Sequence, residues 1–528
     1  MIQRRILGKK KFFPGFLLVC LVAVLAPLAV AADQGDLDTS FGTNGVVVTD
    51  VVGGSEESYG IVVDGSGRLV VGGFDSNGGI PIVVRYLADG SLDTTFGTDG
   101  IAAPIDDISF NDVKLDSSGR ILAAGGESSE DVGRFGLVRY TADGVIDPSF
   151  GTNGVVTTQI PPAEFGDGAW SIVLDASEKI ILSGNCGSEI AYVLCLARYT
   201  PDGTLDTSFG TNGYVYTDLR GWGYDIVIDG SGNLLATTGT TQPDFGVARF
   251  TPDGILDNTF GTNGVAETQL PGFDNTIYTS SVVIDGSNNV IAGGPCFDGV
   301  NMIMFTCMVR FTSDGILDTS FGTNGVITNQ PYGGTSVTVI DDSGRLLQAG
   351  YSCGLTPGSY NNICVSRYTA DGVLDTMFGV DGFAIIDVGE GVDVPRDAVF
   401  DGLGNIIITG QCQPSNLYFD FCLVKFKNAS TPGVPTDVIV IAGSSQVTVV
   451  WNAPNDDGDN AITEYTATAS PGGATCTTAT TSCTITGLTN GTAYTVTVFA
   501  TNGQGDSEIS PAYGPATPGV GDQPGYTG

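Results

Sequence analysis

The sequence contains no histidine, and this absence removes several kinds of site at once. Ser-His-Asp and Cys-His catalysis both need an imidazole, and histidine is also the commonest metal ligand. Basic residues are scarce, because 21 Lys and Arg stand against 58 Asp and Glu. Such an acidic chain is not expected to bind nucleic acid or anionic membranes. A glycine-rich loop of the Walker type is absent as well, which argues against phosphate binding.

Chemistry that uses only carboxylates survives these exclusions. Two positioned acids are sufficient for glycoside hydrolysis. Most of the acids here, however, recur at equivalent turn positions, whereas a catalytic site needs asymmetry. An extracellular carboxylate-dependent enzyme that degrades polysaccharide is therefore kept as the alternative to a protein without enzymatic activity.

Long apolar runs are missing beyond the N-terminus. Five Lys and Arg within residues 4–11 precede an apolar stretch over residues 12–30, and residues 29–31 read Ala-Val-Ala. This order predicts a secretory signal peptide over residues 1–31. The alternative is an uncleaved membrane anchor, but Pro14 and Pro27 interrupt a marginal span. We expect the mature chain to be secreted or held at the cell surface, without inserting into a membrane.

A nine-residue motif organises the chain: it reads LDTSFGTNG from Leu37 and returns six more times. Its phenylalanines lie 51 to 61 residues apart, at Phe41, Phe96, Phe150, Phe209, Phe260, Phe321 and Phe378. Between copies, Val and Ile runs bounded by Gly, Asp and Ser indicate four short strands in each unit. Four strands fit one propeller blade, and seven units without a polar capping repeat favour a closed ring. The sequence predicts an all-β fold with a seven-bladed β-propeller over residues 35–427. Of the two ways to close the ring, we prefer the one in which the N-terminal strand completes the seventh blade.

Two more pieces recur with this motif. An Asp-led turn such as DGSGR from Asp64 lies in the middle of each unit, and an end such as RYLADG from Arg85 closes it. Together the three pieces resemble the bacterial delta-60 repeat. The resemblance implies an exported or surface protein with a propeller-like array and no assigned reaction. The seventh unit departs from the pattern, with Lys425 in place of the arginine.

The composition changes after the seventh unit. Residues 428–434 read as a linker, and residues 435–518 resemble a fibronectin type III domain, an immunoglobulin-like β-sandwich. Trp451 is expected in its core, and the spacing of Leu488 and Tyr494 matches the tyrosine corner of that family. Residues 519–528 are expected to form a flexible tail.

Ten cysteines follow the signal segment and fall into five close pairs: Cys186 with Cys195, Cys296 with Cys307, Cys353 with Cys364, Cys412 with Cys422, and Cys476 with Cys483. In the first four pairs, the second cysteine lies three residues before the Arg or Lys that ends the unit. This equivalence predicts hairpin disulfides and an oxidising location. The fifth pair is predicted to staple one hairpin of the second domain.

Six units repeat an arginine followed eight residues later by an aspartate: Arg85 and Asp93, Arg139 and Asp147, Arg198 and Asp206, Arg249 and Asp257, Arg310 and Asp318, and Arg367 and Asp375. We expect a charge-assisted bond across each blade corner, with the motif phenylalanine packed between blades. A calcium site at the same acids is the functional alternative. No other cofactor is predicted.

The connections between the first and second strands of the units vary in sequence. They contain the aromatic residues of a predicted ligand rim: Phe165, Trp170, Trp222, Tyr224, Phe273 and Tyr332. Acids accompany them, at Glu164, Asp167, Asp274, Glu390 and Asp393. Aromatic faces with carboxylates suit carbohydrates or cationic side chains, although the same aromatics could simply cover blade ends. We therefore expect a non-enzymatic binding or adhesion protein whose partner is a protein or carbohydrate outside the cell.

Overall fold

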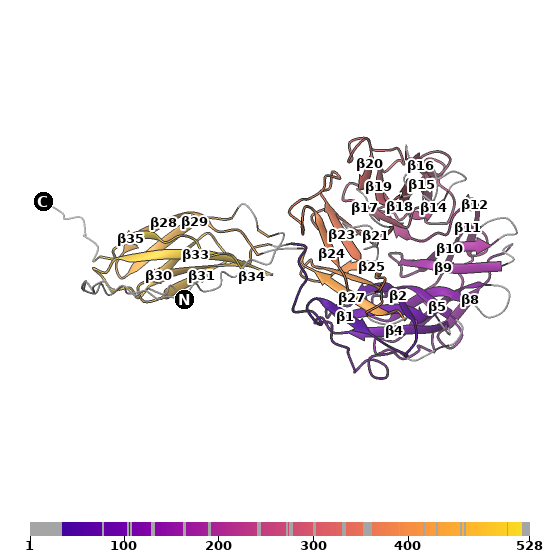
Figure 1. Ribbon diagram of the computed structural model, residues 1–528, viewed down its shortest axis with the longest axis horizontal. Helices are drawn as coiled ribbons and strands as arrows, with labels where there is room; N and C mark the ends of the chain where they lie inside the picture. The colour runs from indigo at the N-terminus through magenta and orange to yellow at the C-terminus, as the bar shows by residue number, and fades with distance from the viewer. Residues whose placement is uncertain are drawn as a thin grey trace, which may run out of the picture. The chain divides into compact units, whose positions relative to one another are not determined.

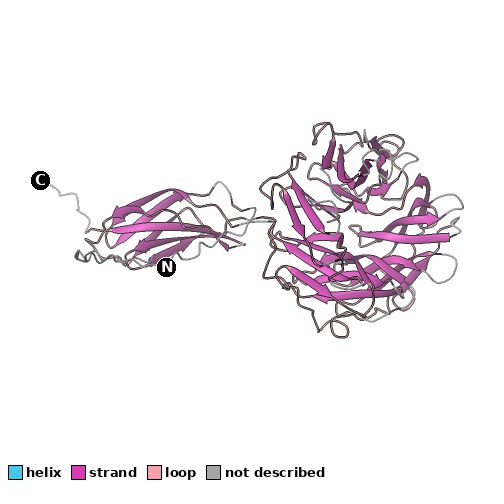
Figure 2. Ribbon diagram, viewed as in Figure 1, coloured by secondary structure: helices cyan, strands magenta, loops and turns pink. Residues whose placement is uncertain are grey.

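The computed structural model describes residues 34–76, 79–102, 105, 108–127, 133–161, 165–187, 192–239, 244–270, 273, 278–298, 303–329, 334–351, 362–389, 391–414, 418–428, 431–454, 457–458, 461–503 and 505–519. Over these ranges every regular element is a strand and none is a helix (Figure 2). No helix in the described part has the length and apolar character that a membrane span requires. The predicted signal peptide and C-terminal tail lie outside the described residues.

Seven small antiparallel sheets form a ring, which Figure 1 shows in successive colours from indigo to orange. Blades 1 to 3 contain β2 (Glu56–Val63), β3 (Leu69–Asp75), β4 (Ile80–Tyr86), β5 (Ile108–Leu115), β6 (Ile121–Glu127), β7 (Arg134–Tyr140), β8 (Val155–Thr158), β9 (Phe165–Leu174), β10 (Ile180–Gly187), β11 (Tyr192–Tyr199) and β12 (Tyr214–Arg220). Blades 4 and 5 contain β13 (Ile226–Ile228), β14 (Leu234–Thr238), β15 (Asp244–Phe250), β16 (Val265–Gln269), β17 (Ser281–Ile284), β18 (Val290–Asp298), β19 (Ile303–Phe311) and β20 (Val326–Asn329). Blades 6 and 7 contain β21 (Thr335–Ile340), β22 (Leu346–Tyr351), β23 (Ile363–Tyr368), β24 (Phe383–Ile386), β25 (Val394–Phe400), β26 (Ile406–Cys412) and β27 (Asp420–Phe426).

The N-terminal strand closes the ring. β1 (Val46–Thr49) pairs antiparallel with β27, with Val46 opposite Val424, so blade 7 combines one strand from the start of the array with three from its end. The first strands of the blades are the inner strands, and each contacts the next around the ring, with β25 returning to β2. In blade 1 the outer strand is reduced to a bridge between Ile101 and Val84. This closure ties the two ends of the propeller together.

The hydrophobic cores lie between blades rather than within them. Seven clusters each combine side chains of two adjacent sheets, and each includes one motif phenylalanine, which is fully buried. Phe209, for example, packs with Ile181 of blade 3 and Ile226 of blade 4. A fully buried phenylalanine contributes about 3 to 5 kcal/mol relative to alanine. The repeated motif therefore holds neighbouring blades together.

Strand direction gives the ring two different faces. The turn face carries the Asp-led turns after the inner strands and the nine-residue motifs before the outer strands. The loop face carries the hairpins between second and third strands and the connections from one blade to the next. Within the motif, Gly45 has a φ of 92°, and a Cβ there would lie 2.7 Å from the Leu37 side chain. Only glycine fits this turn without strain.

The second domain is a sandwich of two antiparallel sheets. One sheet has the order β28 (Thr436–Gly443), β29 (Gln446–Asn452), β32 (Ser482–Thr486), and the other contains β31 (Ala474–Thr478), β30 (Glu464–Ser470), β33 (Tyr494–Asn502), β34 (Gly505–Asp506) and β35 (Tyr513–Ala516). Trp451 is 2% exposed in the core between them. The Thr489 amide donates to the Tyr494 hydroxyl at 3.1 Å, which is the geometry expected of a tyrosine corner.

Candidate ligand-binding site

Each repeated arginine lies in a buried joint on the turn face. The Nε of Arg198 donates to Asp206 at 2.9 Å, and its guanidinium lies 4.6 Å from the centre of the Phe209 ring. A further donor, Nη1, reaches the carbonyl of Pro252 in the next repeat, so the bond crosses between blades. The six predicted Arg and Asp pairs all form, and each arginine lies over the motif phenylalanine: Arg85 with Asp93, Arg139 with Asp147, Arg198 with Asp206, Arg249 with Asp257, Arg310 with Asp318, and Arg367 with Asp375.

The seventh joint uses a lysine. Lys425 pairs with Asp38 at 3.0 Å and with Asp401 at 2.8 Å, and its ammonium lies 5.7 Å from the Phe41 ring. Because Asp38 precedes the first blade, this joint spans the ring closure. The single ammonium group of this joint thus contacts two carboxylates.

Both oxygens of the joint carboxylates are occupied by protein donors. In Asp147, Oδ1 accepts from the amide and hydroxyl of Ser149, while Oδ2 accepts from Arg139. The pKa of Asp147 is lowered, first by the Ser149 hydroxyl and further by Arg139, although burial opposes the change. This arrangement favours the structural interpretation of these acids, because calcium would have to displace donors that the fold already provides.

Three of the predicted hairpin disulfides lie within the described residues. They join the second and third strands of blades 3, 5 and 7, at Cys186 with Cys195, Cys296 with Cys307, and Cys412 with Cys422. Cys353 lies outside the described residues, and Cys364 lies in β23. The disulfides thus reinforce hairpins that point to the loop face.

The fifth cysteine pair differs from its prediction. Cys476 and Cys483 are bonded, but they belong to β31 and β32, which lie in different sheets of the sandwich. The bond therefore links the two sheets instead of stapling one hairpin. Close sequence spacing suggested a hairpin because the turn between these strands is short, yet the chain changes sheets at that turn.

Part of the predicted rim forms a compact aromatic cluster, which we define as Trp170, Tyr192, Trp222, Tyr224 and Tyr278. The ring of Trp222 lies 4.5 Å from that of Tyr192 and 6.1 Å from that of Tyr224. Tyr224 also lies 5.2 Å from Trp170 and 5.6 Å from Tyr278. Trp222 and Tyr192 are each about 40% exposed, so the cluster presents ring faces to solvent.

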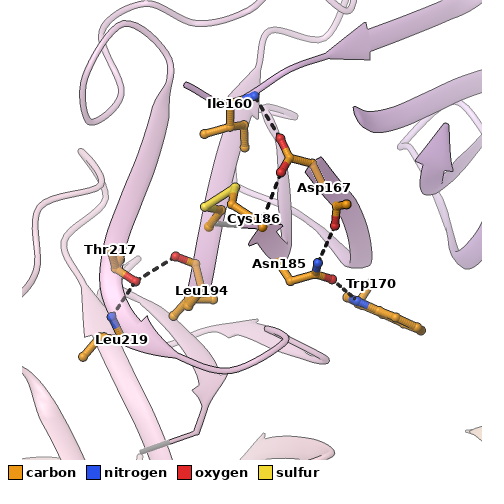
Figure 3. The surroundings of a disulfide bond; sticks show 11 residues. Ile160, Asp167, Trp170, Asn185, Cys186, Leu194, Thr217 and Leu219 are labelled. Atoms are coloured by element: carbon orange, nitrogen blue, oxygen red, sulfur yellow. Dashed lines mark hydrogen bonds between the residues drawn. A yellow bond between two sulfur atoms is a disulfide. The ribbon is translucent and has the colours of Figure 1, made fainter. Parts of the chain in front are cut away.

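The other rim residues do not join this cluster. Phe273 packs edge-on against Phe305, at 5.3 Å, in the core between blades 4 and 5. Tyr332 and the side chain of Phe165 lie outside the described residues. Trp170 was expected in a loop but lies in the inner strand β9, where its Nε1 donates to Asn185 at 2.6 Å (Figure 3). The inner strands of a propeller surround a central channel, and this hydrogen bond fixes the plane of the Trp170 ring on the loop-face side of its inner strand.

A pocket of about 260 Å³ opens among these rings, close to the lower end of the range for ligand pockets. Its lining combines aromatic rings with hydroxyl groups, exposed backbone and one guanidinium: Tyr192, Arg220, Gly221, Trp222, Gly223, Tyr224, Thr237, Thr238, Gly239, Tyr278 and Thr279. These lining residues include no Asp or Glu. The composition suits a ligand with hydroxyl groups and an apolar face better than a cation.

The predicted acidic character of the rim is wrong for two of its residues. Asp167 is 4% exposed, and its carboxylate accepts from the amides of Ile160 and Gly187, as Figure 3 shows. Asp393 is fully buried and accepts from the Val388 amide at 2.9 Å. Burial raises the pKa of each to about 6. These acids hold the connections between blades in place, and Glu164, Asp274 and Glu390 lie outside the described residues.

Deeper in the channel, three blades carry an aspartate at one equivalent position, four residues before the turn Asp. Asp112 and Asp397 lie in β5 and β25, and Asp225 directly precedes β13. Each accepts from an amide of the next blade: Asp112 from Ile172, Asp225 from Val282, and Asp397 from Ile61. Lys114 lies among them, 2.8 Å from Asp112. Burial raises the pKa of Asp225 to about 7, whereas neighbouring Asp112 and Asp397 outweigh burial and raise the pKa of Lys114 to about 12. Sequence reasoning missed these aspartates, because only three of the seven repeats carry one at this position, whereas the turn motif after it recurs in every repeat.

One further acidic group lies on the loop face. Carboxylate oxygens of Asp50, Glu56 and Asp420 come within 4.8 Å of one another. Glu56 is fully buried and accepts from the amides of Val52 and Gly54. Burial, followed by the charges of Glu56 and Asp50, raises the pKa of Asp420 to about 6. This group, and not the repeated Asp, is where the described side chains cluster as cation ligands would.

Sequence reasoning also missed Tyr192, Tyr278, Tyr59 and Arg396 at the channel mouth. Tyr59 and Arg396 occupy the position that Trp170 and Tyr224 occupy in their own blades, five residues before the turn Asp. Aligning the repeats at that position would have found them, because an aromatic residue or arginine there faces the channel.

The fold and the loop-face site define a propeller with a fibronectin-type sandwich, an architecture of the extracellular binding or adhesion type. Family comparison gives the same division. Residues 65–96, 117–150, 179–209 and 227–260 match the DUF5122 β-propeller domain, a domain of unknown function, and residues 433–513 match the fibronectin type III domain. These matches show a DUF5122 β-propeller region and a C-terminal fibronectin type III domain within the chain, and they confirm the resemblance to the delta-60 repeat.

The solved structures that match the chain are distant. The extracellular domain of a hybrid two component system from B. thetaiotaomicron has a TM-score of 0.37 and 12% identity over 88% of this chain and 56% of its own. Chaetomium thermophilum Sqt1, bound to the N-terminus of ribosomal protein L10, has a TM-score of 0.39 and 12% identity over 71% and 98%. Titin kinase and its flanking domains match at 26% identity with a TM-score of 0.16, and the chain spans only 17% of that structure. No curated protein matches the sequence significantly.

Proposed function

We propose that this protein is an exported, non-enzymatic binding or adhesion protein that holds a carbohydrate chain in the aromatic pocket of blades 3 to 5. The observation that carries the proposal is the pocket lining, where Tyr192, Trp222, Tyr224 and Tyr278 are interleaved with threonine hydroxyls and exposed backbone. Sugar rings present an apolar face to aromatic rings and hydroxyl groups to such polar partners. The rigid ring of blades would keep these groups in place before the ligand arrives, which lowers the entropic cost of binding.

Export is part of the proposal. Disulfides and a fibronectin type III domain indicate an extracellular protein. The basic and then apolar order of residues 1–31 supports a cleaved signal peptide as the route. The fibronectin-type domain would act as a spacer or as a second contact.

The channel carboxylates support binding rather than catalysis. Asp112, Asp225 and Asp397 each accept backbone amides that join two blades, so their replacement would disturb the ring. Hydrolysis of a glycoside would need one acid and one base placed freely on either side of the bond. We therefore assign these acids a positioning role.

A glycan array probed with the mature chain tests the proposal. We expect at least one polysaccharide to bind without release of shorter products. Trp222→Ala should weaken binding by about thirtyfold, as expected for a central aromatic anchor. Tyr418→Ala is the matched control, because Tyr418 is an exposed aromatic of blade 7 that does not line the pocket. Shorter products in the supernatant would instead favour a polysaccharide-degrading enzyme, and binding unaffected by Trp222→Ala would reject the pocket.

A further inference from the structure

Arg396 stands out among the inner strands. Arg396 lies five residues before the turn Asp of its blade. The residues at the same position in the other blades are Tyr59, Asn111, Trp170, Tyr224, Ser280 and Ser336. Arg396 is thus the one charged residue of this slot, in a chain that has few basic residues to place. It lies near the start of β25, at the loop-face end of the channel.

Its guanidinium has more donors than the protein uses. Nη2 contacts Gln411 at 3.2 Å and Glu57 at 3.4 Å, and both contacts are long for a charge-assisted bond. Among the described residues, Nε has no hydrogen-bond acceptor. That nitrogen is itself buried, so the donors that remain for an external acceptor are those of Nη1 and Nη2 on this side chain, which is 30% exposed.

The ring of Tyr59 holds the guanidinium in place. The central carbon of Arg396 lies 4.6 Å from the centre of that ring, and Tyr59 stacks in turn on Phe74 at 5.4 Å. A cation fixed on an aromatic face keeps one orientation at little additional entropic cost when a ligand binds. The arginine is therefore preorganised instead of swinging freely in solvent.

Arg396 and Tyr224, which lines the pocket, occupy equivalent positions five residues before the turn Asp, so both lie at the loop-face side of their blades' inner strands. Burial raises the pKa of Tyr224 to about 12, and the positive charge of Arg396 acts against that rise. The same charge opposes the raised pKa of Tyr278, for which burial is again the largest cause. Both tyrosines line the pocket, so a ligand that fills the pocket comes within the field of Arg396.

We propose that Arg396 donates hydrogen bonds to a carboxylate of the bound glycan, so that the ligand is an acidic polysaccharide containing uronic acid. The inference rests on the proposed function and specifies its ligand. Arg220, which lines the pocket, provides a second cation on the same side, while Asp and Glu are absent from the lining. Arginine binds carboxylates through two parallel N–H bonds, whereas a neutral sugar would leave these donors unpaired.

The acidity of the whole protein does not prevent such binding. Charges separated by more than about 8 Å are largely screened at physiological salt, whereas a direct pair at the channel mouth is screened much less. The chain would repel acidic polymers at a distance and still bind them at this one point.

Binding of alginate, polygalacturonate and hyaluronan, each beside its carboxyl-reduced neutral form, tests the inference. We expect at least one acidic polymer to bind about tenfold more tightly than its reduced form. Arg396→Gln should abolish this preference, and Arg396→Lys should retain part of it, because lysine keeps the charge but not the paired donors. Arg134→Gln is the control, since Arg134 is an exposed arginine of the same face and its removal changes the net charge equally.

Three results would overturn the inference, and each identifies a different part of it as wrong. If reduced polymers bind as tightly as acidic ones and Trp222→Ala still weakens them, the proposed function stands and the carboxylate assignment falls. If Arg396→Gln lowers the melting temperature but leaves the preference intact, Arg396 only supports Tyr59 and Glu57. If no polymer of either kind binds, the carbohydrate function itself fails.

Discussion

The two faces of the propeller are built by opposite rules. On the turn face, six blades repeat the same Arg, Asp and Phe joint with nearly equal distances, and the seventh substitutes Lys425. On the loop face, equivalent positions hold tyrosine, tryptophan, asparagine, serine or arginine. Each joint must fit the next blade in one geometry, whereas a side chain at the channel mouth meets solvent. The positions that vary from blade to blade, and with them the proposed ligand site, therefore lie on the loop face.

The channel layer lies between these two extremes. At one slot, Asp112, Asp225 and Asp397 alternate with Gly60, Ser171, Ser281 and Val337. A carboxylate joins two blades through the next amide, so not every blade needs its own. The layer supports the loop-face site without repeating strictly.

Breaking a turn-face joint should have the largest effect. Arg198→Ala removes a cation that is 5% exposed, together with its hydrogen bonds to Asp206 and to the Pro252 carbonyl. Because Lys179 still contacts Asp206 at 2.8 Å, we expect a loss of about 3 kcal/mol in the free energy of unfolding, at the lower end for a broken buried pair. Denaturant unfolding measures it. Arg198→Lys should lower the free energy of unfolding by less, since a lysine, Lys425, forms the equivalent ion pair in the seventh joint. Arg134→Ala, at an exposed site, should cost under about 1 kcal/mol, and an equal loss for Arg198→Ala would show that the joint is dispensable.

Removing a loop-face disulfide should have the next largest effect. Cys412→Ser with Cys422→Ser opens a bond that spans 10 residues, and chain entropy predicts a loss of about 2 to 3 kcal/mol. The same double change at Cys186 and Cys195 should destabilise equally but also weaken ligand binding, because Asn185 beside it holds Trp170. Thermal unfolding and ligand binding, measured for both double variants, separate the effect on stability from the effect on binding. Equal losses of binding in the two variants would contradict the expected role of Asn185.

The buried acids predict an unusual dependence on pH. Because the pKa of Asp225 is raised to about 7, its stabilising contribution is complete below the unfolded value near 3.9 and is lost as pH rises through 7. Asp167 and Asp393, raised to about 6, act in the same direction. We expect the free energy of unfolding to fall by about 1 to 2 kcal/mol per buried acid between pH 5 and pH 8. Asp225→Asn should flatten the curve, and a slope unchanged by this substitution would be incompatible with the assignment.

Changing the loop face itself should affect stability least. Trp222 is 39% exposed, so Trp222→Ala should change the free energy of unfolding by less than about 1 kcal/mol while it weakens binding. Circular dichroism melts and glycan binding on the same samples check both expectations. A large loss of stability would mean that the cluster mainly covers blade ends.

Much of the turn face could be predicted because its residues are close in sequence. Arg198 and Asp206 are eight residues apart, and six copies of that spacing reveal the pair without any long-range information. The aromatic cluster was predicted only in part. Trp222 and Tyr224 were found, but Phe273 turns into the core while Tyr192 and Tyr278 approach from other connections. Which way an aromatic in an irregular connection points depends on the space that neighbouring blades leave.

The sequence by itself determined the number of blades, the sandwich that follows them and the joints between repeats, because each depends on a local pattern that recurs. Only the tertiary structure decided that Arg396 of the last blade meets Tyr59 of the first and shares a channel mouth with Tyr224. These residues come together because β1 closes the ring and brings distant strands side by side. Ring closure is a long-range event, and the asymmetric residues that it gathers leave no periodic signal in the chain.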